Sequence, residues 1–320
     1  MKILAIQNRM GIGDMVILLP FIEAISKKFN SPVSILVKEN SKASEYLEKN
    51  KHIEKILILE RNNNYNNNHG GIIGSFNLAN DLKKYNFEKV FIFNSSLRFH
   101  LICKIAGIKE IFQYPLFQKK QQHLIKTAQS FIKKKLDMDI DSNPIIELEN
   151  LLVENAKKKY NINSNQINIV LGIGGSGPTK RIPSYKFLNF MKMSIKEHDC
   201  KFFLATGTNE EEQNILNEIL NSEFKKRCVP LDKIKIKETL PIIKNCTIAI
   251  CNDSSFSHLS AALNIPTIVL LSDTPLMYGS YSPNMYPIIP DGEKTVTHNT
   301  LGKERINPEK IFKIFQEILN

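Results

Sequence analysis

Short runs of apolar and β-branched residues alternate along the chain with longer segments of helical periodicity. The apolar runs are continuous rather than alternating, which is typical of parallel strands that helices cover on both faces. The expected strands are 2–6, 33–37, 55–59, 89–93, 167–173, 201–206, 246–251 and 267–271. Helical patterns lie between them, for example at 15–29, 187–198 and 209–224. This order predicts an α/β fold with two Rossmann-like domains, each built on a parallel sheet.

The two sets of strands lie on either side of about residue 160. We therefore expect an N-terminal domain over 1–158, a C-terminal domain over 159–305 and a closing helix over 306–320 that packs back toward the N-terminal domain. A chain of 320 residues is long enough to bury two such cores. The Asn-rich stretch 61–71 predicts a surface loop, and "DMDIDSNP" (137–144) predicts an exposed connection.

The composition is that of a globular protein, with 42% hydrophobic and 23% charged residues. We expect a cytoplasmic protein, because no apolar run approaches the roughly 18 residues that span a bilayer and the first residues do not read as a signal peptide. The five cysteines show no CxxC spacing, which indicates buried thiols in a reducing compartment.

The net charge of +11 is concentrated in the first half of the chain. Residues 1–160 hold 25 Lys and Arg against 16 Asp and Glu, whereas the remainder holds 18 against 16. This excess favours an acidic partner such as anionic lipid headgroups or a phosphorylated acceptor. Solvated lysines on helix faces are the alternative explanation for most of these charges. The chain lacks RNA-binding and zinc-finger signatures, so we expect no nucleic-acid partner.

The first expected strand is followed by "GIGDMVILLP" (11–20), a glycine turn that leads into a helix. Such a turn often holds a phosphate at the helix N-terminus, but here Asp14 would repel it. The third glycine of a dinucleotide fingerprint is also missing, because Val16 occupies its place. An Asp after glycines commonly caps a helix, and such a role would be compatible with a chemical one.

Two segments in the second half of the chain contain the residues most suited to binding a phosphorylated ligand. "GIGGSGPTKRIP" (172–183) follows a buried strand and brings Ser176, Thr179, Lys180 and Arg181 to a flexible loop. This composition suits a pyrophosphate clamp, although a turn with surface cations would look similar. It is not a Walker loop, because Lys180 is followed by Arg rather than by Ser or Thr.

The second segment, "NDSSFSHLSAAL" (252–263), follows another strand at the edge where open α/β sheets bind ligands. Ser254 and Ser255 are expected to cap the next helix and to leave backbone N–H groups free for an anion. His258, one turn into that helix, either faces the same anion or is a structural histidine. The donor-binding residues expected from the two segments are Ser176, Thr179, Lys180, Arg181, Asp253, Ser254, Ser255, Phe256 and His258.

The motifs together resemble glycosyltransferase family 9, the bacterial heptosyltransferases. The family's G-D-x5-P segment is matched by Gly13, Asp14 and Pro20, its second-domain motifs by "GGSGPTKRIP" and "NDSSFSHLSAAL", and its closing helix by "INPEKIFKIFQEIL". The resemblance runs over essentially the whole chain. Two departures lie near the donor: Ser255 replaces a glycine, and "LLSDTPLMYG" (270–279) replaces L-F-G-P-T-D-P.

The resemblance implies a GT-B architecture of two facing Rossmann-like domains, with the nucleotide sugar in the C-terminal domain and the acceptor in the N-terminal one. It implies an inverting, metal-independent transfer of a heptose-like sugar from ADP-heptose to a lipopolysaccharide-core or related acceptor, with no cofactor. Asp14 would be the general base across a cleft from the diphosphate. Gly11, Gly13, Lys119 and Lys120 would lie near the acceptor.

The acceptor implied by the resemblance is an anionic, lipid-linked glycan. We therefore expect a monomer that contacts the inner face of the cytoplasmic membrane peripherally. Two other functions remain open at this point, a GT-B-shaped sugar-nucleotide epimerase and a non-catalytic nucleotide-binding protein. A dehydrogenase is disfavoured by the missing third glycine.

Overall fold

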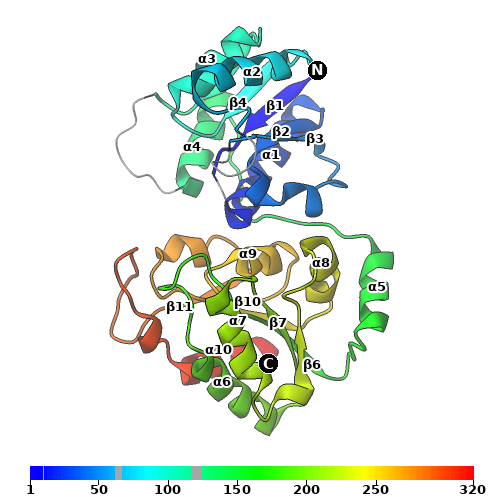
Figure 1. The fold of residues 1–320 in the computed structure, drawn as a ribbon, viewed down its shortest axis with the longest axis vertical. Helices are drawn as coiled ribbons and strands as arrows, with labels where there is room; N and C mark the ends of the chain where they lie inside the picture. Colours follow the sequence, from blue (N-terminus) through cyan, green and yellow to red (C-terminus); the bar gives the residue numbers. More distant parts are fainter. Residues whose placement is uncertain (10, 62–66, 117–123) are drawn as a thin grey trace. The chain divides into compact units, whose positions relative to one another are not determined.

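The computed structural model describes residues 1–9, 11–61, 67–116 and 124–320. The chain forms two compact units, Met1–Pro144 and Ile145–Asn320 (Figure 1). Each unit contains one all-parallel sheet with helices on both faces, which confirms the predicted α/β class.

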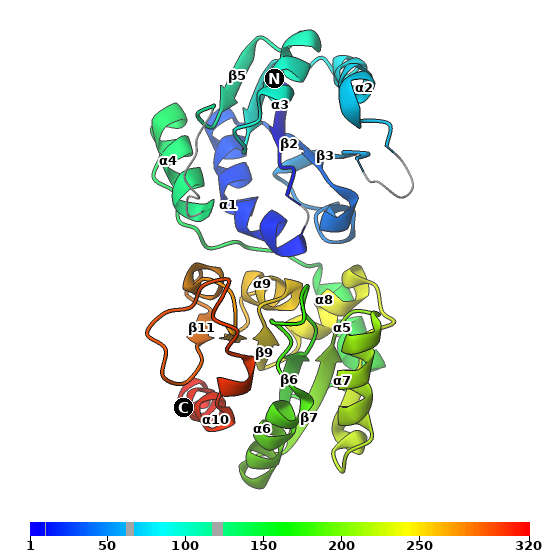
Figure 2. The same cartoon turned by 60° about the vertical axis from the view of Figure 1, so that its left-hand side comes forward.

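The first unit has a five-stranded sheet in the order β3-β2-β1-β4-β5. Its strands are β1 (Ile3–Ile6), β2 (Val33–Val37), β3 (Ile53–Ile58), β4 (Lys89–Ile92) and β5 (Glu110–Gln113). Its helices are α1 (Ile12–Phe29), α2 (Gly71–Lys83), α3 (Leu97–Ile105) and α4 (Leu124–Leu136), with short 3₁₀ turns η1 (Glu39–Ser41) and η2 (Ala43–Glu45). Helix α4 packs on α1, and α2 packs on α3 (Figure 2). The α2–α3 pair closes an apolar core with residues of β1, β2 and β4.

The second unit has a six-stranded sheet in the order β11-β10-β9-β6-β7-β8. Its strands are β6 (Ile167–Gly172), β7 (Cys200–Ala205), β8 (Cys228–Pro230), β9 (Ile248–Asn252), β10 (Thr267–Leu270) and β11 (Met285–Ile288). Its helices are α5 (Asn150–Lys159), α6 (Ser184–Glu197), α7 (Glu210–Leu220), α8 (Ile236–Lys244), α9 (Ser255–Ala262) and α10 (Pro308–Leu319). The 3₁₀ turns are η3 (Lys225–Arg227), η4 (Leu276–Gly279) and η5 (Lys303–Arg305).

The division between the units falls earlier than the expected boundary at 158/159. Helix α5 packs against α8, and the Asn245 side chain donates a 2.8 Å hydrogen bond to the carbonyl of Val153, so this helix belongs to the second unit. The closing helix also differs from expectation. Helix α10 packs on α6, β10 and β11, because Ile311 and Phe315 are buried in the apolar core of the second unit.

All eight expected strands are present within a few residues, whereas β5, β8 and β11 were not expected. Each of the three lies at an edge of its sheet. Edge strands are short and pair with a neighbouring strand on one side only. In addition, β8 and β11 each contain a proline, which is not found in central strands because it cannot donate a hydrogen bond to the next strand. Their apolar signal is therefore too weak to stand out in the sequence.

Candidate functional site

The loop between β6 and α6 places Lys180 against the carboxyl end of β9. The Lys180 Nζ donates a 2.6 Å hydrogen bond to Oδ2 of Asp253, which follows the last residue of β9. The Asp253 side chain is 6% exposed and that of Lys180 is 24% exposed. An ammonium group has three N–H donors, and the Asp253 carboxylate accepts one of them. Lys180 is thus held in place while part of its charged end still reaches solvent.

The other residues of the expected clamp have different environments. The Arg181 guanidinium donates 3.0 Å from Nε to the Gly175 carbonyl and pairs through Nη1 with Glu211, so it fixes the loop to itself and to α7. The Thr179 carbonyl accepts a 2.8 Å hydrogen bond from the Ser272 hydroxyl. Ser176 lies exposed on the loop. Lys180 is therefore the clamp cation that reaches the end of β9.

Helix α9 begins directly behind this loop. Ser254 occupies the N-cap position, but its side chain makes no capping hydrogen bond, contrary to expectation. Its hydroxyl oxygen is instead buried without a partner among the described residues, as is Oδ1 of Asn252. Ser255 is the first helical residue and is partly exposed, whereas Phe256 is buried. Buried polar atoms without partners are rare in proteins, and here two of them lie at one helix N-terminus beside Lys180.

His258 faces the same cluster from the inside of the unit. Its Nδ1 lies 2.7 Å from the Tyr281 hydroxyl, the two rings stack, and its Nε2 lies 3.8 Å from Oδ1 of Asp253. Burial, and secondarily the charge of Asp253, raises the pKa of Tyr281 well above its usual value, so its hydroxyl stays protonated and can donate to Nδ1. His258 therefore lies beside Asp253 and contacts Tyr281, whereas Lys180 is held by Asp253 directly.

A buried carboxylate under the loop was missed by the sequence reasoning. Glu212 Oε1 accepts a 2.7 Å hydrogen bond from the Gly175 N–H, and Glu212 also forms a capping pair with Asn209 at the start of α7. A Cβ at Gly174 would lie 2.5 Å from Oε1, so a side chain there would displace the Glu212 carboxylate from its present position. The N-x-x-E spacing of Asn209 and Glu212 is the signal that could have revealed this support.

In the first unit, Asp14 lies at the third position of α1, just beyond the carboxyl end of β1. Its Oδ2 accepts a 3.2 Å hydrogen bond from the Gly11 N–H, and Oδ1 lies 3.5 Å from the Arg9 guanidinium. Gly11, rather than Asp14, is the N-cap residue, so the carboxylate reaches back to the helix start. The Asp14 side chain is still 24% exposed, which leaves it accessible to a substrate.

Three buried polar groups share this edge of the sheet with Asp14. Gln7 follows β1, Asn94 comes two residues after β4, and Tyr114 follows β5. Gln7 Nε2, Asn94 Nδ2 and the Tyr114 hydroxyl are buried without hydrogen-bond partners among the described residues. Sequence reasoning missed all three, because isolated polar residues after strands carry no motif. They are the groups that could hold the hydroxyls of a bound glycan.

Of the other residues expected near the acceptor, two lie in the described part of the chain and two do not. Gly11 and Gly13 lie at the start of α1, beside Asp14, and both are partly exposed. Lys119 and Lys120 lie outside the described residues. Within the described ranges, no group of three or more His, Cys, Asp or Glu side chains could hold a metal ion, and no described helix is both long and apolar enough to span a bilayer.

These features define a class of protein. Two units with parallel sheets each carry a polar site at the carboxyl ends of the strands, one with a carboxylate and one with a held cation beside a helix N-terminus. Such sites bind phosphorylated ligands and polar substrates at the switch points of open sheets. The architecture is that of the two-domain GT-B glycosyltransferases.

The family follows from comparison with known proteins. The family model of glycosyltransferase family 9 (heptosyltransferase) matches residues 79–301, which is more than half of the chain. The protein therefore belongs to this family and is a glycosyltransferase, as its motifs predict.

Individual relatives agree with this assignment. The chain is 24% identical to lipopolysaccharide heptosyltransferase 1 of Campylobacter coli, and the alignment covers 99% of both chains. The solved structure of E. coli ADP-heptose LPS heptosyltransferase II has a TM-score of 0.74 at 18% identity, covering 100% of this chain and 98% of that one. A family 9 glycosyl transferase of Veillonella parvula has a TM-score of 0.79 at 16% identity, covering 99% and 97%. At these identities the two structures show a shared fold.

Proposed function

We propose that this protein transfers a heptose from ADP-heptose to a lipid-linked acceptor of the lipopolysaccharide-core type, with inversion at the anomeric carbon. The family and the full-length similarity to a lipopolysaccharide heptosyltransferase support the reaction class and the acceptor class. The observation that carries the proposal is the Lys180–Asp253 pair at the N-terminus of α9, together with buried polar atoms of Asn252 and Ser254 that have no hydrogen-bond partner in the part of the chain that the structure describes.

The second unit would bind the donor and stabilise its leaving group. When the sugar departs, negative charge grows on the diphosphate, and Lys180 together with the α9 backbone N–H groups supplies positive potential where that charge develops. Asp253 keeps the lysine in place, so no reorganisation is needed at the moment of reaction. The Ser254 hydroxyl and the side-chain oxygen Oδ1 of Asn252, which have no partner among the described residues, could form hydrogen bonds with polar groups of the nucleotide sugar. We infer that this charge compensation makes a metal ion unnecessary.

The first unit would bind the acceptor and activate it. The acceptor oxygen forms a bond to the anomeric carbon while the bond from that carbon to the diphosphate oxygen breaks, and the hydroxyl proton passes to a base. Asp14 is a carboxylate with an accessible edge, and the Gly11 N–H and Arg9 fix its orientation. Gln7, Asn94 and Tyr114 would hold neighbouring hydroxyls. One displacement without a covalent intermediate inverts the configuration.

We infer that the enzyme works as a monomer at the cytoplasmic face of the membrane that carries its acceptor. The first unit, Met1–Pro144, holds 22 Lys and Arg against 13 Asp and Glu, so it attracts anionic headgroups and phosphorylated glycans. Lys134 and Lys135 on α4 are exposed, whereas Lys133 is paired with Asp137 and Asp139.

The substitution Asp14→Asn tests the mechanism. The amide oxygen can still accept from the Gly11 N–H, so the start of α1 is preserved, but the amide cannot take a proton. We expect turnover to fall by about 10²–10⁴-fold with donor affinity nearly unchanged. The assay is heptose transfer from ADP-heptose to a core acceptor, with and without EDTA, and the anomeric configuration of the product is read by NMR.

The matched control is Asp137→Asn, an exposed carboxylate of the same unit, which should keep full activity. Near-native turnover of Asp14→Asn, or a product with retained configuration, would remove Asp14 from the mechanism. Loss of all transfer in EDTA would contradict a metal-independent reaction. Isomerisation of the donor sugar in the absence of acceptor would instead support an epimerase.

A further inference from the structure

Two neighbouring helices of the first unit expose an unusual number of large apolar side chains. Ile72 and Ile73, in the first turn of α2, are 80% and 78% exposed. The α2/α3 apolar surface, as we call it, consists of Ile72, Ile73, Phe76, Leu97, Leu101 and Ile105. The α3 members are spaced i, i+4 and i+8, so they form one stripe along that helix. A soluble protein gains nothing from keeping such side chains in water, and clustered exposure marks an interaction surface.

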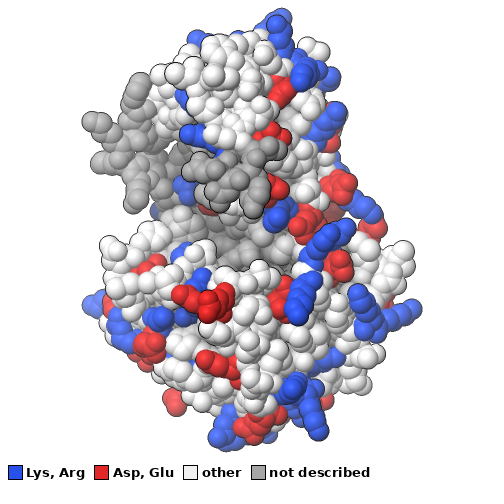
Figure 3. Space-filling view, viewed as in Figure 1, with Lys and Arg blue, Asp and Glu red and all other residues white. Residues whose placement is uncertain are grey.

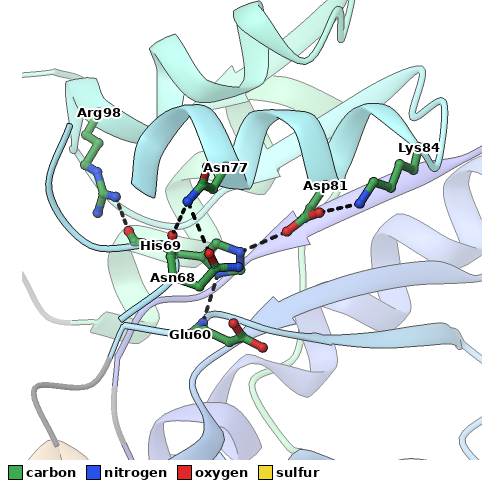
Figure 4. Close-up of polar contacts among 7 residues, drawn as sticks. All are labelled: Glu60, Asn68, His69, Asn77, Asp81, Lys84 and Arg98. Atoms are coloured by element: carbon green, nitrogen blue, oxygen red, sulfur yellow. Dashed lines mark hydrogen bonds and ion pairs between the residues drawn. The ribbon is translucent and has the colours of Figure 1, made fainter. Parts of the chain in front are cut away.

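The two helices present these side chains together because one arginine of α3 forms hydrogen bonds with Ser75 of α2 and with His69, which precedes that helix. Arg98 of α3 donates 2.9 Å from Nε to the Ser75 hydroxyl of α2 and through Nη2 to the carbonyl of His69, as Figure 4 shows for the latter contact. The helices also pack along their length. In Figure 3 the surface over α2 and α3 is mostly uncharged, with Lys and Arg side chains and fewer Asp and Glu side chains at its margins.

The charged residues around the α2/α3 apolar surface indicate what kind of partner it binds. Residues 71–109 contain six Lys and Arg but two acidic residues, Asp81 and Glu88. Asp81 is already paired with Lys84 and His69. By contrast, the exposed apolar residues near α5, Ile145 and Leu151, stand among acidic residues at 147, 149 and 154. Apolar side chains surrounded by Lys and Arg are suited to bind an anionic bilayer, because the cations are attracted to its headgroups. Apolar side chains surrounded by carboxylates are not, because the carboxylates are repelled.

The position of the surface fits this partner. Helix α2 follows the carboxyl end of β3 and α3 follows that of β4, so Ile72, Ile73 and Leu97 lie toward the same edge of the sheet as Asp14. A bilayer in contact with the first turns of α2 and α3 would hold a lipid-linked acceptor near the end of the unit that carries the proposed base. Helix α4 packs on α1, which leads from β1 to β2, whereas α2 and α3 lead across the sheet in the opposite direction. Right-handed crossovers therefore place α4 and its lysines on the other face of the sheet from α2 and α3.

We propose that the α2/α3 apolar surface inserts into the boundary between headgroups and acyl chains of an anionic membrane, with the exposed Lys83 and Lys104 against the headgroups. This inference rests on the proposed function for the lipid-linked nature of the acceptor. The membrane contact itself depends on exposed side chains of one unit and can be measured without any transfer reaction.

The test measures binding of the full chain to vesicles of phosphatidylcholine, with and without phosphatidylglycerol, over a range of salt concentrations. The variants are Ile72→Ser with Ile73→Ser on α2, and Leu97→Ser with Leu101→Ser on α3. Each pair should weaken binding to anionic vesicles by about tenfold or more at every salt concentration, because burial of apolar area is not screened by salt. Lys83→Gln with Lys104→Gln should instead flatten the salt dependence.

The matched control is Ile145→Ser with Leu151→Ser, which removes apolar side chains of similar exposure from the second unit and should leave vesicle binding unchanged. Transfer to a soluble, delipidated acceptor should be normal in all these variants, so a failure of the proposed function shows in that assay alone. Unchanged vesicle binding by both surface variants would overturn the proposal. A dimer in sedimentation that the same substitutions dissociate, without effect on vesicles, would also overturn it and assign the surface to a second copy.

Discussion

Lys180 and Arg181 are adjacent cations with different surroundings. Arg181 is engaged by the Gly175 carbonyl and by Glu211, so its charge is used within the protein. Lys180 touches Asp253 at the N-terminus of α9, where a diphosphate would find both the ammonium group and backbone N–H groups. At the scale of single residues, Lys180 is therefore the decisive cation for the donor, and Arg181 is a residue that shapes the loop.

We expect Lys180→Ala to weaken ADP binding by about 1.5–3 kcal/mol, the value of one hydrogen bond to a charged group. Calorimetry with ADP measures this directly. The control is Lys192→Ala, an exposed lysine on α6 that should bind ADP like the native protein. Equal affinities for the two variants would show that the β6–α6 loop does not hold the diphosphate.

At the scale of elements, the start of α2 depends on one buried histidine. The Glu60 N–H donates 3.0 Å to Nδ1 of His69, so in the neutral ring the hydrogen is on Nε2, 3.2 Å from Asp81 (Figure 4). Lys84, and secondarily His69, lowers the pKa of Asp81, so the carboxylate stays ionised. The network connects the segment after β3 to Asp81 in the last turn of α2, and Arg98 extends it to α3.

We expect His69→Ala to lower the free energy of unfolding by about 1–3 kcal/mol, because the Glu60 N–H would be left without its acceptor. Denaturant unfolding followed by circular dichroism gives this quantity. His298→Ala, at an exposed position, serves as the control and should change little. If both variants unfold at the same denaturant concentration, the network does not stabilise α2.

At the scale of the whole molecule, the two units have separate cores and separate polar sites. The buried residues of the first core come from β1, β2, β4, α2 and α3, and those of the second from β6, β7, β9, β10, α6 and α10, among others. Each sheet is closed by its own helices, so a ligand of one site can stabilise one unit without the other.

Hydrogen exchange measured with and without ADP follows from this division. We expect slower exchange at backbone amides of 173–183 and 252–258, because a ligand that binds the folded state suppresses local opening around its site. Amides of β1 and β4 should exchange at unchanged rates. Protection confined to the first unit would contradict the assignment of the donor to the second.

The sequence by itself determined the central strands, the helices between them and the family. Continuous apolar runs such as 33–37 and 267–271 are typical of buried parallel strands, and motifs such as "NDSSFSHLSAAL" keep their chemistry within a few consecutive residues. A local sequence pattern is enough to predict an element or a motif when the residues that form it are neighbours in the chain.

The tertiary structure alone decided contacts between distant segments. It joined Lys180 to Asp253, placed Glu212 under Gly175, and gave α5 and α10 to the second unit. It also separated Arg181 from the clamp and brought Gln7, Asn94 and Tyr114 to the edge of the sheet where Asp14 lies, although these three are unremarkable in sequence. Such contacts depend on strand order and on which side chains are left unpaired after packing, and neither property has a local signature along the chain.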